Sequence, residues 1–255
     1  MANADAAAGE RAAGLLRGAM DDPSSLLAPL PAECTPADAA QAYAVQAVLM
    51  EGLGAIGGWK VGAASNEALP VTAPMPAAWL HHGPAVLPVA QYPRPLAEGE
   101  TCYRIGRDLP PAGAPYSREQ IIDAIAAIHV GAEIVQPRFP DPASLDPLVA
   151  LADLLGHAGY VVGDEVVEWQ GIDLAAQSLA LNLDGAEAKS RAGYPFPEPI
   201  RIIQWLANEG SHWAGGLKAD QFVTTGSWIG AVPMRIDQAA EVVVTGVGKV
   251  AFIFG

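Results

Sequence analysis

The chain has 255 residues, of which 51% are apolar and 16% charged, and its formal net charge is −14. This composition predicts a globular protein that buries a sizeable core, and it excludes a disordered chain. The acidic balance argues against nucleic acid and anionic membranes as partners, because both require a basic face. The sequence has no leader pattern and no bilayer-length apolar run, and its two cysteines, Cys34 and Cys102, suit a reducing compartment. We therefore expect a cytoplasmic protein with reduced thiols.

Two alanine-rich helices are predicted in the first part of the chain. The first covers residues 5–20, and the second is capped by Thr35, has Pro36 at its first position and ends near Gly52. We expect a helical segment over residues 1–55, followed by a catalytic domain over residues 56–255. The helical segment is either a small layer on this domain or an oligomer contact.

A short strand is predicted at Gly58-Trp59-Lys60-Val61-Gly62. Lys60 is either a solvated strand lysine or a partly desolvated one that moves a proton or anchors an anion. Residues 63–97 then predict a long loop with short strands. His81 and His82 lie inside this loop. Neighbours on a strand point to opposite faces, so a surface pair is the favoured interpretation of the two histidines.

The most informative stretch begins with Glu98-Gly99-Glu100 and continues into β-prone residues. In a strand, Glu98 and Glu100 point to the same face, and their repulsion raises at least one pKa unless a cation neutralises it. Oxygen ligands favour a hard ion, so Mg²⁺ or Mn²⁺ is expected rather than Zn²⁺. The alternative is a solvated pair on an edge strand.

A second strand supplies a third carboxylate. Ser117 and Gln120 form a capping box, and a helix is predicted with Ile121, Ile125 and Ile128 on one face. The following run, residues 132–135, is a strand in which Glu133 is the single acid. A lone carboxylate on a buried strand is costly unless it is paired or bound to metal. Glu133 is therefore the best candidate for a third ligand.

The remainder predicts a hairpin over residues 179–190, a helix over residues 199–208, and strands over residues 221–225, 227–232, 241–245 and 249–254. The sequence contains no phosphate-binding loop, no zinc-ligand spacing and no nucleophile elbow. These patterns leave the reaction open.

With these elements placed, the chain resembles the fumarylacetoacetate hydrolase superfamily, and within it the 2-keto-4-pentenoate hydratase group. The resemblance runs from about Gly58 to the C-terminus, and order and spacing of the matching segments agree. The segments are GWKVG (58–62), EGETCYRIGRDLP (98–110), AEIVQPRF (132–139), the Trp169/Asp173-Leu174 segment, WLAN (205–208) and LKADQFVTTGSW (217–228).

The resemblance implies an α+β fold that has a mixed β-roll or sandwich core, flanking helices and an N-terminal helical layer. It implies one Mg²⁺ or Mn²⁺ ion, with Glu98, Glu100 and Glu133 at the ligand positions. It also puts Lys60 at the position of the family's catalytic lysine. The family's TTGS segment lines the substrate end, which points to Thr225 and Ser227.

The implied activity is that of a metal-dependent enzyme acting on a 2-keto acid through an enolate, most simply a 2-keto-4-pentenoate (2-hydroxydienoate) hydratase of aromatic catabolism. An acylpyruvate hydrolase, a 2-keto acid decarboxylase and a non-catalytic partner subunit are the alternatives. We expect a homo-oligomer, with a decarboxylase as a further partner.

Two departures from the hydratase pattern concern the hydration step rather than the metal site. Family members carry an aspartate in the loop after the lysine strand, whereas Glu67 is the single acid between residues 66 and 97 and lies too early. His81 or His82 is the proposed substitute. Leu154 also replaces the asparagine that usually follows Asp153.

Overall fold

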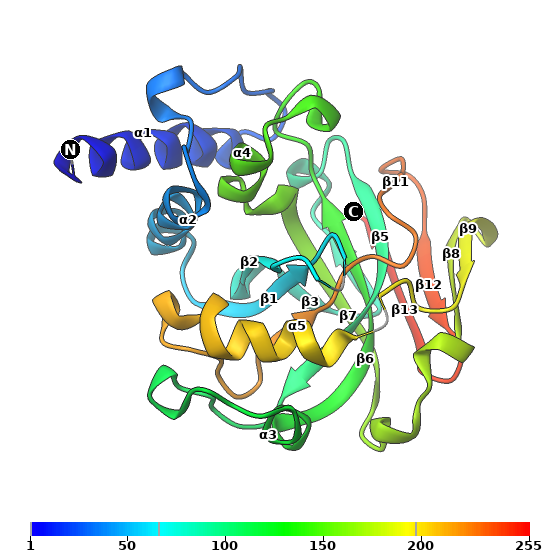
Figure 1. Cartoon of the computed structure of the whole chain (residues 1–255). Coiled ribbons are helices and arrows are strands. Elements are labelled where there is room, and N and C mark those ends of the chain that lie inside the picture. The colour runs from blue at the N-terminus through cyan, green and yellow to red at the C-terminus, as the bar shows by residue number, and fades with distance from the viewer. Residues whose placement is uncertain (1, 66, 197) are drawn as a thin grey trace.

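The computed structural model describes residues 2–65, 67–196 and 198–255, and it has two sheets with helices beside them (Figure 1). The larger sheet has eight strands in the order β2-β1-β10-β5-β6-β7-β3, with β11 paired to β5. Its bounds are β1 (Ile56–Gly62), β2 (Val71–Pro76), β3 (Leu80–His82), β5 (Leu96–Ile105), β6 (Ile125–Val135), β7 (His157–Val166), β10 (Phe222–Thr224) and β11 (Val232–Pro233).

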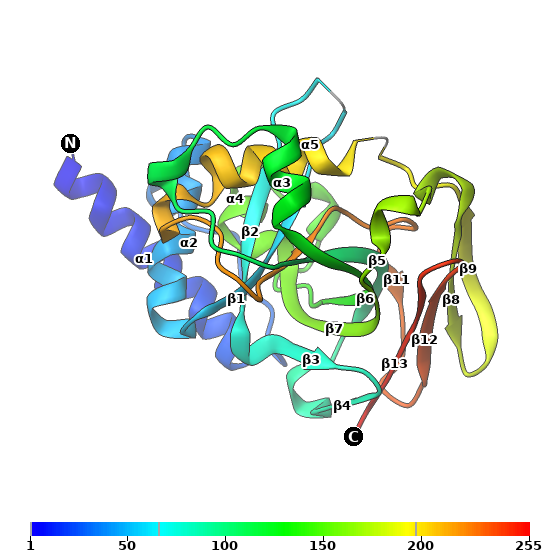
Figure 2. The same cartoon turned by 90° about the horizontal axis from the view of Figure 1, so that it is seen from below.

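The smaller sheet has five strands in the order β4-β13-β12-β8-β9. Its bounds are β4 (Ala85–Leu87), β8 (Ser178–Leu183), β9 (Ala186–Ala192), β12 (Ala240–Val244) and β13 (Gly248–Phe254). It packs on one face of the larger sheet, while the helices lie on the other side of the molecule (Figures 1 and 2). The expected hairpin is β8–β9.

Side-chain alternation divides the strands of the larger sheet between two environments. In β5, Ala97, Tyr103 and Ile105 join the core that this sheet shares with the smaller one. Glu98 and Glu100 alternate with these residues along the strand and face the concave side. β5 and β6 are antiparallel, and Glu98 lies directly opposite Glu133. The concave side therefore positions the site.

Five α-helices flank the sheets in the described part of the chain: α1 (Ala2–Asp21), α2 (Ala39–Leu53), α3 (Arg118–Ala124), α4 (Pro147–Ala152) and α5 (Pro199–Trp205). α1, α2 and α4 share a separate apolar cluster. α2 starts later than expected, because its capping residue is Asp38 and not Thr35. The Asp38 side chain accepts a hydrogen bond from the backbone N–H of Gln41. The capping box of Ser117 and Gln120 is present on α3.

Two elements differ from the sequence prediction. The helix expected to run through Ile125 and Ile128 ends at Ala124, and β6 begins at Ile125. Of the strand expected over residues 227–232, only Val232 is in a strand, β11, and the residues before it form a loop in which Gly230 adopts a positive φ angle of 70°. None of the helices in the described residues is both long and apolar enough for a membrane span.

Candidate metal centre

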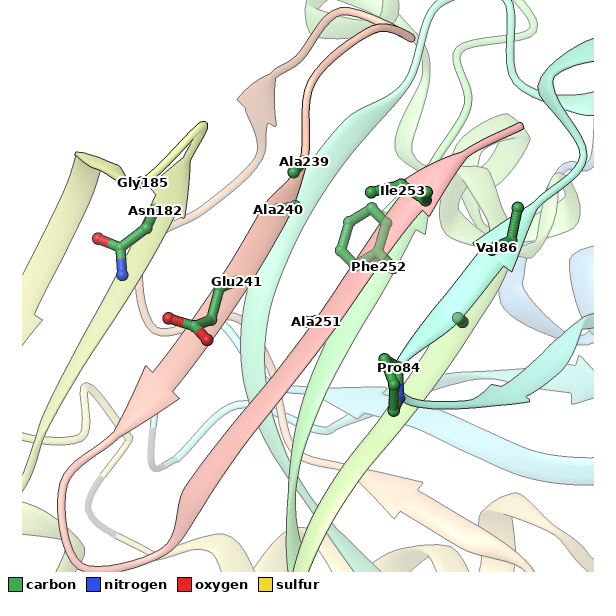
Figure 3. Close-up of a pocket in the computed structure, with 11 residues that line it drawn as sticks. Pro84, Val86, Asn182, Gly185, Ala239, Ala240, Glu241, Ala251, Phe252 and Ile253 are labelled. Carbon is green, nitrogen blue, oxygen red and sulfur yellow. The ribbon is translucent and has the colours of Figure 1, made fainter.

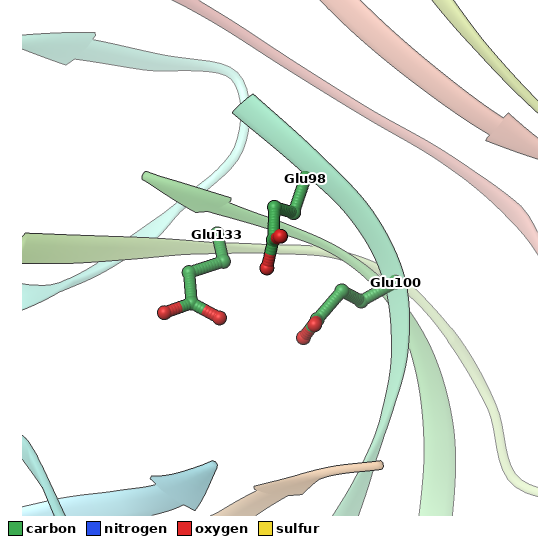
Figure 4. Close-up of side chains that lie close together, drawn as sticks. All are labelled: Glu98, Glu100 and Glu133. Atoms are coloured by element: carbon green, nitrogen blue, oxygen red, sulfur yellow. The ribbon is translucent and has the colours of Figure 1, made fainter. Parts of the chain in front are cut away.

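Three carboxylates meet on the concave side of the larger sheet. Glu98, Glu100 and Glu133 each offer an oxygen, and these oxygens lie within 4.8 Å of one another. Figure 4 shows the three side chains pointing toward a common space from β5 and β6. The pleat accounts for this arrangement, because Glu98 and Glu100 are two residues apart on one strand and Glu133 is opposite Glu98.

The charges of this group need compensation. Glu100 and Glu133 are 1% and 0% exposed. Burial, followed by the charge of Glu133, raises the pKa of Glu100 well above its ordinary value. Burial also raises the pKa of Glu98 to about 7, with the Glu133 charge acting in the same direction. Such a group is stable either when protonated or when it holds a cation.

The donor set fits a hard divalent ion. Oε2 of Glu100 and Oε2 of Glu133 are buried and have no hydrogen-bond partner. Buried carboxylate oxygens rarely remain unpaired unless a ligand satisfies them. Three carboxylates without cysteine suit Mg²⁺ or Mn²⁺, as expected from the oxygen-only set.

Lys60 lies beside this group. β1 places its Nζ 2.7 Å from Oε1 of Glu133 and 3.3 Å from the carbonyl oxygen of Leu155. Burial acts to lower the pKa of Lys60, but the charges of Glu133, Glu98 and Glu100 outweigh it and the pKa is raised. The Lys60 side chain is only 14% exposed and is paired with Glu133, so Lys60 is not a solvated strand lysine.

A second nitrogen contacts the same oxygen of Glu133. His157 is 0% exposed, and its Nδ1 lies 3.0 Å from Oε1. Burial acts to raise the pKa of Glu133, but the charge of Lys60 and the hydrogen bond from His157 outweigh it and lower the pKa. Glu133 is therefore ionised, whereas the pKa values of its two neighbours on β5, Glu98 and Glu100, are raised.

The turn between α4 and β7 contains Leu155, whose carbonyl group Lys60 contacts, and it leads directly into His157, the first residue of β7. Leu154 and Leu155 have φ angles of 53° and 55°, a left-handed conformation that branched residues rarely adopt. The buried Arg138 spans the turn, with Nη1 3.3 Å from Oδ1 of Asp153 and Nη2 donating to the backbone oxygen of His157. Strained backbone that a buried ion pair holds in place is typical of functional sites.

Tyr160 is a neighbour of the glutamate group across the β6–β7 pair. It lies opposite Glu133 on β7, and its ring covers Gly131, where an added Cβ would lie 1.9 Å from the hydroxyl oxygen. Glycine is required at this position because any side chain would displace Tyr160. Tyr160 belongs to a small buried cluster that also contains Cys102 and Phe222.

The TTGS segment, residues 224–227, begins at the last residue of β10, the strand that pairs with β1 and β5. Thr225 is fully buried, and its hydroxyl oxygen lies 2.5 Å from the Tyr194 hydroxyl. Oγ of Ser227 is buried and has no hydrogen-bond partner. A role for either residue in substrate binding stays a prediction.

The two histidines of the loop lie apart from the glutamates. β3 pairs with β7 at the edge of the sheet, where His81 is opposite Val161. The His82 ring lies 6.2 Å from the Phe222 ring. The structure thus brings together Lys60 and the three glutamates and leaves His81 and His82 outside that group.

His157, Tyr160 and the Leu155 carbonyl were not expected from the sequence. A shift in the β6–β7 register between Ile134 and Val135 puts His157 within reach of Glu133. A single sequence carries no signal of such a shift. The sequence signal for this contact was limited to the presence of a histidine, His157, just before the strand predicted at Tyr160.

Another hollow lies on the smaller sheet, between β4, β13 and β12, with a volume of about 520 Å³ (Figure 3). Its walls are mainly apolar and include Val86, Phe252 and Ile253. Its one carboxylate belongs to Glu241, which pairs with Lys249 at 3.0 Å. This hollow thus lacks the gathered carboxylates of the glutamate centre.

Several curated proteins and solved structures are similar to this chain. No family model matches the chain. The 2-keto-4-pentenoate hydratase of Paraburkholderia phymatum is 28% identical over 241 residues, which cover 89% of this chain and 90% of that protein. A hydratase of the same name from Paraburkholderia xenovorans is 25% identical over 165 residues, covering 64% of this chain and 60% of that protein. That match thus spans less than two thirds of the relative.

Solved structures share the fold. The 4-oxalocrotonate decarboxylase from Pseudomonas putida G7, complexed with calcium and acetate, superposes with a TM-score of 0.82 at 20% identity, covering 97% of each chain. A Yersinia pestis structure described as a fumarylacetoacetate hydrolase family protein has a TM-score of 0.58 at 17% identity, covering 77% of this chain and 91% of its own.

Proposed function

We propose that this chain, which has the fold of the fumarylacetoacetate hydrolase superfamily, is a divalent-metal-dependent lyase acting on a 2-keto acid. The first candidate reaction is the hydration of a 2-keto-4-pentenoate (2-hydroxydienoate) in the degradation of aromatic compounds. The names of the curated relatives support it. The observation that carries the proposal is the convergence of three carboxylates on one point, with Lys60 beside them.

Glu98, Glu100 and Glu133 would hold a Mg²⁺ or Mn²⁺ ion that acts as a Lewis acid toward the carboxylate and keto oxygens of the substrate. Lys60 would supply the proton. Its raised pKa keeps Nζ protonated at neutral pH, so it acts first as a donor. The Leu155 carbonyl and Oε1 of Glu133 orient Nζ, while Thr225 and Ser227 would contact the substrate tail.

Decarboxylation is the second candidate reaction. It exchanges a carboxylate for a proton and consumes no water, so Lys60 alone could serve it. Hydration also needs a group that delivers water, and His81 and His82, which were expected to fill this role, lie on the edge strand β3 and are not part of the glutamate group. The structural likeness to 4-oxalocrotonate decarboxylase supports this candidate as well.

Product analysis distinguishes these reactions. The purified protein with Mg²⁺ or Mn²⁺ is incubated with a 2-hydroxydienoate, a 2-oxo-enedioate such as 4-oxalocrotonate, and an acylpyruvate, and the products are identified by NMR. Hydration gives a 4-hydroxy-2-keto acid, decarboxylation gives CO₂, and hydrolysis gives pyruvate with a second acid. Metal uptake without turnover of any substrate would indicate the non-catalytic partner subunit instead.

The expected homo-oligomer belongs to the same proposal. Light scattering coupled to size exclusion measures the mass of the assembly, alone and mixed with a decarboxylase partner. A monomer at micromolar concentration would contradict this part.

A further inference from the structure

We infer that His157 is a positioning residue of the metal centre, which determines the oxygen of Glu133 that faces the cation; this inference rests on the proposed function. The ring is fully buried, with Nδ1 3.0 Å from Oε1 of Glu133. An ionised carboxylate only accepts hydrogen bonds, so Nδ1 carries the proton in this contact.

The two oxygens of Glu133 have different surroundings. Oε1 accepts from Nδ1 of His157 at 3.0 Å and lies 2.7 Å from Nζ of Lys60. Oε2 is buried and has no partner. One oxygen is thus fully occupied by protein donors, and the other is left for a ligand. Glu133 would bind the cation through Oε2 alone.

His157 is what makes this division stable. The terminal torsion of a glutamate has broad, roughly two-fold preferences, so its oxygens exchange easily when nothing holds them. Lys60 alone would not fix the orientation of the Glu133 carboxylate, because its ammonium group lies on a flexible four-carbon stem and its donors rotate. A histidine N–H in a fixed plane holds one oxygen in one direction.

His157 itself has little freedom to move. Arg138 donates to its backbone oxygen and pairs with Asp153 at the start of the turn. The ring lies 5.8 Å from the ring of Trp79. Groups that orient a metal ligand in this way usually affect metal affinity or activity 10- to 100-fold when they are removed.

Four variants test the inference: His157→Ala, His157→Asn, His157→Gln and, as a control, His129→Ala. The asparagine amide can donate from the position of Nδ1, whereas the glutamine amide reaches the position of Nε2. His129 is also buried in β6, but its Nδ1 contacts the Gly163 oxygen at 3.1 Å. Mn²⁺ affinity is measured by calorimetry, the Mn²⁺ environment by EPR, and the fold by near-UV circular dichroism.

We expect His157→Ala and His157→Gln to bind Mn²⁺ about 10- to 100-fold more weakly, with an altered EPR spectrum. His157→Asn should bind within about threefold of wild type, and His129→Ala should lose thermal stability but keep its Mn²⁺ affinity. If His157→Ala does not fold, the asparagine and glutamine variants decide the question.

Unchanged Mn²⁺ binding in the folded alanine or glutamine variant would overturn the inference, and so would an asparagine variant as weak as the glutamine one. A wild-type protein that binds no Mn²⁺ would instead overturn the proposed function. The two failures are therefore distinguishable.

Discussion

Nζ of Lys60 lies 2.7 Å from Oε1 of Glu133, and both side chains are largely withdrawn from water. Each charge compensates the other, so the lysine is held charged next to the space into which the carboxylates point. This pairing joins the proton donor to the ligand set and leads to the first prediction.

Lys60→Met should lower kcat by about 10²- to 10⁴-fold, the usual contribution of a positioned proton donor. The affinity for Mn²⁺ should stay the same or increase, because a positive charge beside the site is lost. Steady-state kinetics and calorimetry measure both quantities. Lys249→Met is the matched control, since Lys249 pairs with Glu241 on the exposed face of the smaller sheet. A higher KM with normal kcat would argue against the proton role.

Glu100→Gln should separate stability from metal binding. The neutral amide removes one of three neighbouring carboxylates, so the metal-free variant should melt at or above the temperature of the metal-free wild type. Wild type should gain about 2.7 kcal/mol at a hundredfold excess of Mn²⁺ over Kd, or roughly 5 to 10 °C in Tm. Scanning fluorimetry should show no such gain in the variant. A full Mn²⁺ shift in Glu100→Gln would remove Glu100 from the ligand set.

The stability of the metal-free protein should fall as the pH rises from about 4.5 to 7. Over this window the folded protein keeps a proton on Glu98, whose pKa is about 7, that the unfolded chain has already released. The free energy of unfolding therefore decreases as the pH rises through this window, and it levels off once Glu98 is ionised in the folded protein as well. Saturating Mn²⁺ should reverse this trend, because the cation favours the ionised carboxylates. Melting curves at pH 5.5, 7 and 8.5 with and without Mn²⁺ test this, and parallel pH profiles would refute it.

Arg138→Met should reduce the free energy of unfolding by about 3–5 kcal/mol, because it leaves the Asp153 carboxylate buried and unpaired. The side chains of this pair are 3% and 4% exposed. Arg235→Met is the control, since its pair with Asp237 is 67% and 69% exposed and should contribute less than about 1 kcal/mol. Urea unfolding measures both variants. Equal losses would indicate that burial of the Arg138 pair carries no particular weight.

The close approach of Glu98, Glu100 and Glu133 could be predicted because it depends on two simple rules. Residues two apart share a strand face, and a lone acid in an apolar strand requires a partner. These rules do not say that the two strands are neighbours. That part of the prediction came from the family resemblance, which put all three glutamates at the ligand positions of one ion. Their binding of a cation stays a prediction until it is measured.

The boundary between α3 and β6 could not be predicted. Ile125 and Ile128 fit a helical face, but the whole run from Ile125 to Val135 is buried on both faces as a strand. Periodicity does not distinguish a helix from such a strand. The contact of His157 with Glu133 was missed for another reason, since it depends on a shift in strand pairing that no local pattern encodes.

The direct pairing of Glu98 with Glu133 has a consequence for refolding. A slip of one residue between β5 and β6 would turn a carboxylate into the apolar layer between the two sheets. Such a misaligned chain would have no place for the cation. Mn²⁺ uptake by refolded material would therefore report the native alignment of these strands, and metal present during refolding should enrich that alignment over slipped ones.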